Sequence, residues 1–368
     1  MARLPGMTSR DDRELLRHHG DVDAEPGLLD FAVNVRLNRP PPWLRTRLAG
    51  ALDRLGHYPS SAEDAAARSA VAARHGRPAE DVLLLSGAAE CFALLPSLRP
   101  RLAAVVHPSF TEPEFALRSA GVPVTRVPLD PQDGYRLRSG AVPEEADMVV
   151  LGNPTNPTSV LHPAETIRRL ARPGRTLVVD EAFADAVPGE SESLAADRIP
   201  GVLVVRSLTK MWGLPGLRAG YALAEPELLA ELSASRPHWP LGTLALEAIA
   251  ACCDSGALTE AEQAATRIAA HRDAFAAELA ALEDVHVHGP AAAPFLLLRI
   301  PGGERVRERL RQRGIAVRRG DTFPGLDTDH VRVSVRAPED NAVLVEALRE
   351  ILGMRGSSAD RSRRGATV

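Results

Sequence analysis

One lysine stands alone in a chain that otherwise takes its side-chain basic charge from arginine. Lysine and arginine together number 44, and Lys210 is the only lysine among them. Arginine stays protonated and cannot attack a carbonyl group as a free amine, whereas a lysine with a lowered pKa can. Lys210 is therefore a candidate to form an imine with a carbonyl compound. Composition alone leaves open the alternative that an arginine-biased chain kept one lysine by chance.

Two further candidate sites lie where apolar runs end. Asp180 closes the run TLVVD, and a buried carboxylate needs a cationic partner. The alternative for Asp180 is a helix N-cap, a common position for aspartate. The turn SGAAE follows another run, and the backbone N–H groups of Ala88 and Ala89 at the start of a helix can cradle a phosphate. Any strand–helix turn shows this second pattern, so the turn indicates a phosphate site only together with other residues.

Short apolar runs, most of them separated by amphipathic segments, must position these residues. The runs predict buried strands at 82–86, 102–106, 124–129, 148–151, 176–180 and 202–207. Such alternation indicates an α/β fold with a mostly parallel sheet covered by helices on both faces. Ligands of such sheets bind beyond the carboxyl ends of the strands. Since the candidate residues follow strand ends, we expect them to meet in one site.

The pattern changes after residue 224. Helices are predicted at 226–234, 241–254, 259–281 and 339–352, and strands at 295–300, 315–318 and 330–335. We expect an N-terminal segment (1–42) packed on a small domain, a large domain (43–235), the small α+β domain (236–353) and a disordered tail (354–368). The first 25 or so residues, polar and rich in charge, are expected to be loosely ordered.

The segment RSLTKMWGLPGLRAGYALA (206–224) resembles the Schiff-base signature of the class I and II aminotransferases, which are fold-type-I pyridoxal-phosphate enzymes. The resemblance covers nearly the whole chain and implies a seven-stranded sheet in the large domain. It makes Lys210 the residue that holds pyridoxal 5'-phosphate. It also implies that Ser207 and Arg218 bind the cofactor phosphate and that Asp180 pairs with the protonated ring nitrogen.

Three other positions match cofactor-binding residues of the family. Asn156, in NPTNPTS, fits the donor to the cofactor's ring oxygen, and the alternative is a proline-rich turn. Phe110 fits the aromatic that stacks on the cofactor ring, and the alternative is a core phenylalanine. Tyr58, in HYP, resembles a tyrosine that reaches the cofactor phosphate of the other subunit, which implies a homodimer. Its alternative is a surface turn.

On the substrate side, the resemblance implies an anion site. Arg332 fits an arginine that grips the substrate carboxylate, for which a bidentate guanidinium is well shaped. Arg318 matches an arginine that binds the phosphate in relatives with phosphorylated substrates, and Asn34 matches a substrate-side asparagine. Arginine is abundant in this chain, so a plain surface charge is the alternative for Arg318.

Within the family, the sequence is most similar to the histidinol-phosphate aminotransferases and to the threonine-phosphate decarboxylases of cobalamin biosynthesis. Phe183 stands where the aminotransferases usually have tyrosine, and this resembles the decarboxylase branch. We therefore predict an enzyme for a phosphorylated L-amino acid, with decarboxylation of L-threonine O-3-phosphate as the first reading. The alternatives are an aminotransferase of the histidinol-phosphate type and a non-catalytic sensor module that binds the cofactor.

Composition limits the partners, the cell compartment and the cysteine chemistry that we expect. The net charge of -4 gives no reason to expect nucleic acid or an anionic membrane as a partner. No apolar stretch is long enough to span a bilayer and no secretion signal is visible, so we expect a cytoplasmic protein. The three cysteines, of which Cys252 and Cys253 are neighbours, predict neither a disulfide framework nor a metal site.

Overall fold

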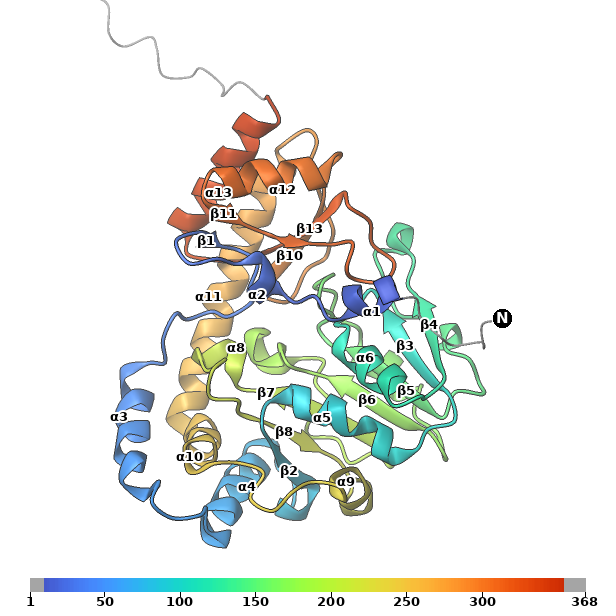
Figure 1. Ribbon diagram of the computed structural model, residues 1–368, viewed down its shortest axis with the longest axis vertical. Helices are drawn as coiled ribbons and strands as arrows, with labels where there is room; N and C mark the ends of the chain where they lie inside the picture. Colours follow the sequence, from blue (N-terminus) through green and yellow to red (C-terminus); the bar gives the residue numbers. More distant parts are fainter. Residues whose placement is uncertain (1–9, 354–368) are drawn as a thin grey trace, which may run out of the picture.

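The computed structural model describes residues 10–353. Figure 1 shows a broad part built on a large sheet and a narrower part built on a small one, with the long helix α11 (Ser255–Ala280) running between them. The tail at 354–368, predicted to be disordered, lies outside the described residues, as do residues 1–9.

The large sheet has seven strands in the order β2-β8-β7-β6-β5-β3-β4. Within it, β8 runs antiparallel to both of its neighbours, and the other pairs are parallel. Each of the six apolar runs forms a strand, so the predicted α/β class with a seven-stranded, mostly parallel sheet is confirmed. The strands are β2 (Val82–Leu85), β3 (Ala103–His107), β4 (Val124–Pro128), β5 (Met148–Gly152), β6 (Thr176–Asp180), β7 (Val202–Ser207) and β8 (Gly220–Leu223).

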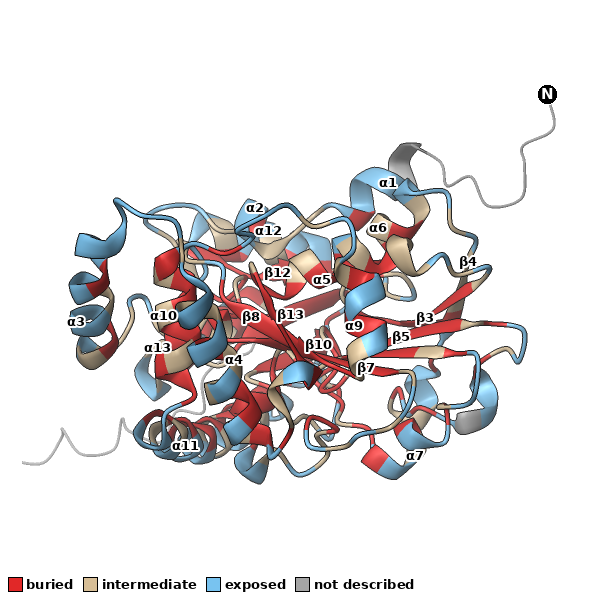
Figure 2. Ribbon diagram, turned by 90° about the horizontal axis from the view of Figure 1, so that it is seen from below, coloured by how far each residue is buried: buried red, intermediate tan, exposed pale blue. Residues whose placement is uncertain are grey.

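Alternate side chains of these strands enter two separate hydrophobic cores. In β5, Val149 and Leu151 belong to one core, and Met148 and Val150 belong to the other. Helices cover both faces, which explains why the strands are continuous apolar runs (Figure 2). The first core is covered by α3 (Pro42–Ala51), α4 (Ser61–His75), α7 (Ala164–Arg168), α10 (Thr243–Cys252) and the start of α11, and the second by α5 (Ala88–Leu94), α6 (Glu112–Ser119) and α9 (Pro226–Ser233).

A four-stranded antiparallel sheet, in the order β12-β13-β10-β9, forms the small domain. The strand β1 (Leu29–Asp30) of the N-terminal segment pairs in parallel with β11 (Ile315–Ala316), and Phe31 enters the small domain's core. The segment therefore packs on the small domain. The remaining elements here are β9 (His286–Val287), β10 (Phe295–Arg299), α12 (Gly303–Gln312), β12 (Arg318–Arg319), β13 (His330–Ser334) and α13 (Pro338–Ile351).

Helix α11 contributes to both domains. Ala257 and Ile268 of α11 belong to the core of the large sheet, whereas Phe275 and Leu279 belong to the small domain's core. Helix α10 packs against α3 and α4 of the large domain. We therefore propose that the domain boundary lies within α11 rather than at residue 236, where the end of the strand–helix pattern placed it.

Candidate active site

A cavity of about 540 Å³ lies at the carboxyl ends of the central strands. Gly152, Asp180 and Ser207 are the last residues of β5, β6 and β7, and all three line the cavity. Parallel strands end at one edge of a sheet, so residues far apart in sequence meet there. The small domain contributes the other wall. The predicted site residues in the cavity wall are Asn34, Ala88, Ala89, Phe110, Asn156, Asp180, Ser207, Lys210, Arg218, Arg318 and Arg332.

Lys210 lies in α8 (Thr209–Trp212), which begins two residues after β7 ends. Burial lowers the pKa of its amine to about 8, and the nearby positive charges of Arg332 and Arg218 add to this effect. Asp180 opposes the shift. A large fraction of the amine is therefore neutral near pH 8, which is the form that can attack a carbonyl carbon.

Asp180 is the last residue of β6 and accepts one hydrogen bond, from the backbone N–H of Ala182 at 3.0 Å. Burial raises the pKa of its carboxyl group to about 6, although Ala182 and Lys210 favour the charged form. A carboxylate at this depth is stabilised by a cation placed in the cavity. The protonated nitrogen of a pyridine ring would provide one.

A group of donors that could bind a phosphate lies around the turn between β2 and α5. Gly87 has φ of 77° there, and a Cβ at this position would lie 2.6 Å from Nη2 of Arg218. The close approach therefore requires glycine and brings Arg218 to the first N–H groups of α5. Ser207, at the end of β7, and Thr209, at the start of α8, also line the cavity, and their hydroxyl groups lie 2.7 Å apart. The sequence analysis did not predict Thr209 as a residue of the cavity wall. Its position two residues after Ser207 was the signal that could have indicated it.

Arg332 and Asn156 hold one another across the cavity. Nη1 of Arg332 donates to Oδ1 of Asn156 at 2.7 Å, and Nη2 donates to the carbonyl oxygen of Ala32. Because the amide oxygen of Asn156 is already bound, its nitrogen is left as the donor for a ligand. The guanidinium also lies 5.5 Å from the ring centre of Phe295.

Arg318 and Asn34 complete the wall on the side of the small domain. Arg318 of β12 is paired in register with Arg332 of β13, so two arginines lie side by side. Oδ1 of Asn34 accepts from the hydroxyl of Ser334 at 2.6 Å, while its buried Nδ2 has no hydrogen-bond partner among the described residues. Two guanidinium groups beside an unused amide donor form a site suited to an anion.

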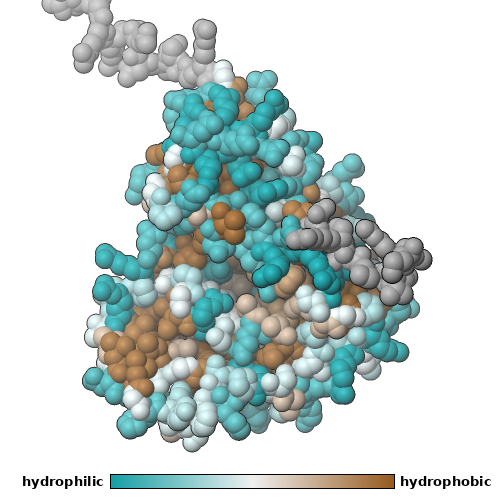
Figure 3. Space-filling view, viewed as in Figure 1, coloured by the Kyte–Doolittle hydropathy of each residue, from teal (hydrophilic) through white to brown (hydrophobic). Residues whose placement is uncertain are grey.

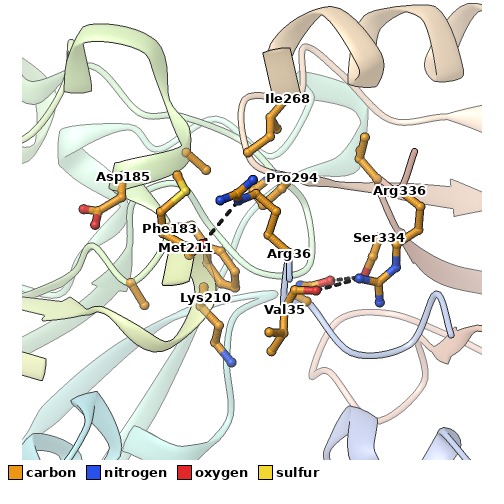
Figure 4. Close-up of a pocket in the computed structure, with 14 residues that line it drawn as sticks. Val35, Arg36, Phe183, Asp185, Lys210, Met211, Ile268, Pro294, Ser334 and Arg336 are labelled. Carbon is orange, nitrogen blue, oxygen red and sulfur yellow. Dashed lines mark hydrogen bonds between the residues drawn. The ribbon is translucent and has the colours of Figure 1, made fainter. Parts of the chain in front are cut away.

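A smaller cavity, of about 20 Å³, lies on another side of Lys210. Nε of Arg36 donates to the carbonyl oxygen of Met211 at 3.2 Å. The backbone N–H of Arg36 donates to the carbonyl oxygen of Lys210 at 3.1 Å. Figure 4 shows the Lys210 side chain extending away from Asp185 and from the guanidinium of Arg36. The N-terminal segment therefore binds the backbone next to the lysine side chain rather than its amine.

The expectation that the first 25 residues are loosely ordered is wrong for the described part of that stretch. The helices α1 (Arg10–Leu16) and α2 (Gly20–Asp23) form there, and the carbonyl oxygen of Leu16 accepts from the hydroxyl of Thr111 at 2.6 Å. His19 lies 3.1 Å from the carboxylate of Glu112 and 5.3 Å, ring to ring, from Phe110. Contacts with both domains order this segment, and its polar composition gave no signal of them.

Tyr58 is the predicted site residue that this chain does not bring to the cavity. Its side chain is 74% exposed and stacks on Trp239 at 4.3 Å between ring centres. Leu52, Leu55 and Trp239 are also exposed. Figure 3 shows an apolar area on this side of the molecule, over α3.

The residues of the cavity fit pyridoxal phosphate. The partly buried carboxylate of Asp180 suits the ring nitrogen, the donors around Gly87 suit the phosphate, and the lysine amine with its low pKa suits the aldehyde. A model of the family described as aminotransferase class I and II matches residues 26–351. The chain belongs to the class I and II aminotransferase family.

Several relatives are similar over almost the whole chain. A histidinol-phosphate aminotransferase of Mycobacterium tuberculosis is 54% identical over 334 residues, 91% of this chain and 90% of the relative. The threonine-phosphate decarboxylase of Salmonella typhimurium is 31% identical over 336 residues, 88% of this chain and 91% of the relative. The crystal structure of a histidinol-phosphate aminotransferase from Clostridium acetobutylicum superposes with a TM-score of 0.82 at 25% identity, covering 89% of this chain and 99% of that one.

Membership of the aminotransferase family confirms the predicted fold type, an enzymatic function and the dependence on pyridoxal phosphate. It thereby removes the alternative of a non-catalytic sensor module. No helix in the described part of the chain is long and apolar enough to cross a bilayer. Among the described residues, no cluster of histidine, cysteine and acidic side chains could hold a metal ion.

Proposed function

We propose that this aminotransferase-family enzyme transfers the amino group of a phosphorylated substrate of the histidinol-phosphate type. The pair Arg318 and Arg332 carries the proposal, because it adds a second anion site to the one that serves the cofactor phosphate. The relative at 54% identity, named for histidinol phosphate, supports the same substrate class. A substrate with both an amine and a phosphate would place the amine near Lys210 while its phosphate meets the arginines.

The cavity residues have different roles in this reaction. When bound, pyridoxal phosphate supplies an electron sink for negative charge at the substrate's α-carbon. The carboxylate of Asp180 would keep a proton on the ring nitrogen, and the amide nitrogen of Asn156 would donate to the ring oxygen. Lys210 acts as the general base that takes the proton from the α-carbon, a role that its lowered pKa favours.

The reaction type differs from the one that the sequence reading put first. The relatives support the aminotransferase alternative better than the decarboxylase, at 54% against 31% identity. Phe183 is the observation that still favours decarboxylation, because it lines the cavity and brings no hydroxyl to it. Threonine phosphate decarboxylation therefore stays as the second candidate.

The two candidates are separated by their products. The holoenzyme should convert histidinol phosphate and an amino acceptor into a keto or aldehyde product, with transient loss of the cofactor's yellow colour. It should release no CO₂ from L-threonine O-3-phosphate. The Lys210→Arg variant should be inactive in both assays. CO₂ release without loss of colour would reverse the assignment in favour of the decarboxylase.

We also propose that the enzyme is a cytoplasmic homodimer in which Tyr58 acts on the partner's cofactor phosphate. The support is the exposed group of Leu52, Leu55, Tyr58 and Trp239, which we call the apolar patch. A second copy packed on this patch would bury these side chains.

A further inference from the structure

Arg318 is a cavity arginine with an acidic partner of its own. Nη1 of Arg318 donates to Oδ2 of Asp23 at 3.2 Å, and Nη2 donates to the carbonyl oxygen of His18 at 2.7 Å. The guanidinium also lies 4.7 Å from the ring centre of Phe323. Arg318 lines the cavity and Asp23 does not, so the carboxylate holds the guanidinium from the side away from a ligand.

Asp23 itself is buried, at 6% exposure. Its carboxylate has two more neighbours, Nε2 of His18 at 3.2 Å and Nη1 of Arg307 at 4.0 Å. Burial and the charge of Arg318 lower the pKa of His18, although Asp23 opposes this, so the imidazole is neutral near pH 7. Arg318 at 3.2 Å is therefore the nearest positive charge to Asp23.

Arg332, the neighbour of Arg318 on the next strand, is held differently. Its hydrogen bonds go to the side-chain oxygen of Asn156 and to the carbonyl oxygen of Ala32, both uncharged. Among the described residues, Arg318 thus has a carboxylate within 4 Å, whereas Arg332 has none at that distance. A ligand therefore meets one guanidinium whose charge a neighbouring carboxylate offsets in part, and one whose hydrogen-bond partners are uncharged.

We propose that Asp23 is a positioning residue that holds Arg318 in place and limits how tightly the cavity binds the anionic group of the substrate. The proposal rests on the proposed function, since it needs Arg318 to meet that group. A fixed negative charge a few ångströms behind the guanidinium repels the ligand's charge, and it repels a dianion about twice as strongly as a monoanion. Two uncompensated arginines would hold a phosphorylated product longer and slow its release.

The charge of Asp23 can be removed while its contact is kept. The side chain in Asp23→Asn has the same shape and still accepts a hydrogen bond from Arg318, but it has no charge. Calorimetric titration of the holoenzyme with inorganic phosphate at pH 8 should give a dissociation constant roughly tenfold lower than in wild type. Acetate, a monoanion, should gain only about threefold. In turnover, KM for histidinol phosphate should fall while kcat falls or stays constant.

Three further variants make the outcome decisive. Asp23→Glu keeps the charge and should bind phosphate within about twofold of wild type. Asp321→Asn removes a carboxylate from Arg319, a neighbour outside the cavity wall, and should also bind as wild type. Asp23→Ser provides a second charge-removing variant should Asp23→Asn fail to fold, and the same gain is expected.

Unchanged or weaker phosphate binding in folded Asp23→Asn or Asp23→Ser would overturn the inference, because a purely structural role predicts no gain. Arg318→Gln tests the proposed function separately, and phosphate binding and KM should both weaken by tenfold or more. If Arg318→Gln has no effect on either quantity, the substrate site itself is misplaced and both proposals fail.

Discussion

The pKa values of two ionisable cavity residues, Lys210 and Asp180, are both shifted in the direction that favours the neutral form. Burial brings the lysine's pKa down to about 8 and raises that of the aspartate to about 6. Each shift disfavours the charged form, as expected for groups that are partly withdrawn from water. Pyridoxal phosphate reacts with the neutral form of the amine, and its ring nitrogen supplies a cation that stabilises the carboxylate. Both pKa shifts are therefore matched to the chemistry of the cofactor.

The rate at which Lys210 captures the cofactor should report its lowered pKa. Only the neutral amine reacts, so the rate of formation of the yellow complex from apoenzyme should rise with pH and level off above about 8. An ordinary lysine would continue to gain up to about pH 10. Stopped-flow absorbance measures this rate, and a rise that persists to pH 10 would contradict the low pKa.

After borohydride reduction, peptide mapping should find the label on Lys210, and Lys210→Arg should remain unlabelled.

Asp180→Asn should stabilise the apoenzyme and weaken cofactor binding. The folded pKa of about 6 lies above the ordinary value of 3.8, so the ionised carboxylate destabilises the fold, and this penalty develops as pH rises from 4 through 6. Urea unfolding of the two apoenzymes at pH 8 should show a gain of about 1–2 kcal/mol, reduced from the full shift because water in the cavity screens the group. At pH 4 the difference should vanish. A gain that is equal at pH 4 and pH 8 would mean that charge is not its cause.

At the scale of elements, a buried ionic network ties the strands behind the cavity together. Arg206 of β7 contacts Glu181 at 3.0 Å, Glu190 at 2.6 Å and the carboxylate of Asp185. Arg74 of α4 reaches the same Asp185 at 2.9 Å. Since Arg206 precedes Ser207, and Glu181 follows Asp180, the network fixes the two strand ends that carry the site relative to one another.

Removal of Asp185 should therefore be costly. Asp185→Ala leaves Arg206 and Arg74 buried with one counter-ion fewer, and the loss of a partner from a buried pair typically costs about 3–5 kcal/mol. Thermal unfolding of the holoenzyme should show this loss. The matched control is Glu231→Ala, which breaks an exposed pair with Arg99 at 3.2 Å and should cost less than about 1 kcal/mol. Equal effects for both variants would show that the network adds no stability.

At the scale of the whole molecule, the cavity belongs to two domains and is crossed by a segment from the start of the chain. The pairs Arg318–Asp23 and Arg332–Ala32 join residues about 300 positions apart in sequence. Residues 10–24 also contact the large domain through Thr111 and Glu112. Relative motion of the domains would therefore change the anion site directly.

The apolar patch should hold two copies of the enzyme together. Leu55→Arg places a charge at a side chain that is 52% exposed in one chain, and sedimentation velocity should show dissociation of the dimer with loss of activity. The control is Val343→Arg on α13, similarly exposed at 49% but away from the patch, which should leave the dimer intact.

Mixing Tyr58→Phe with Lys210→Ala chains should restore one site with both residues. A wild-type monomer with full activity would refute the shared site.

The local sequence determined the strands and the residues at their ends. Runs such as 148–151 and 176–180 are apolar throughout because helices cover both faces of the sheet, and that pattern is visible without a structure. The carboxyl ends of parallel strands share one edge, so Asp180, Ser207 and Lys210 could be assigned to one site. The special chemistry of Lys210 was visible in its isolation among 43 arginines.

Only the tertiary structure decided which distant groups complete that site. It brought Asp23 to Arg318 and His19 to Phe110, although the segment that carries them is polar and lacks a strong periodic pattern. It left Tyr58 outside the cavity and carried α10 into the large domain's core. These contacts depend on how two domains pack across hundreds of residues, whereas periodicity and motif spacing report only on neighbours along the chain.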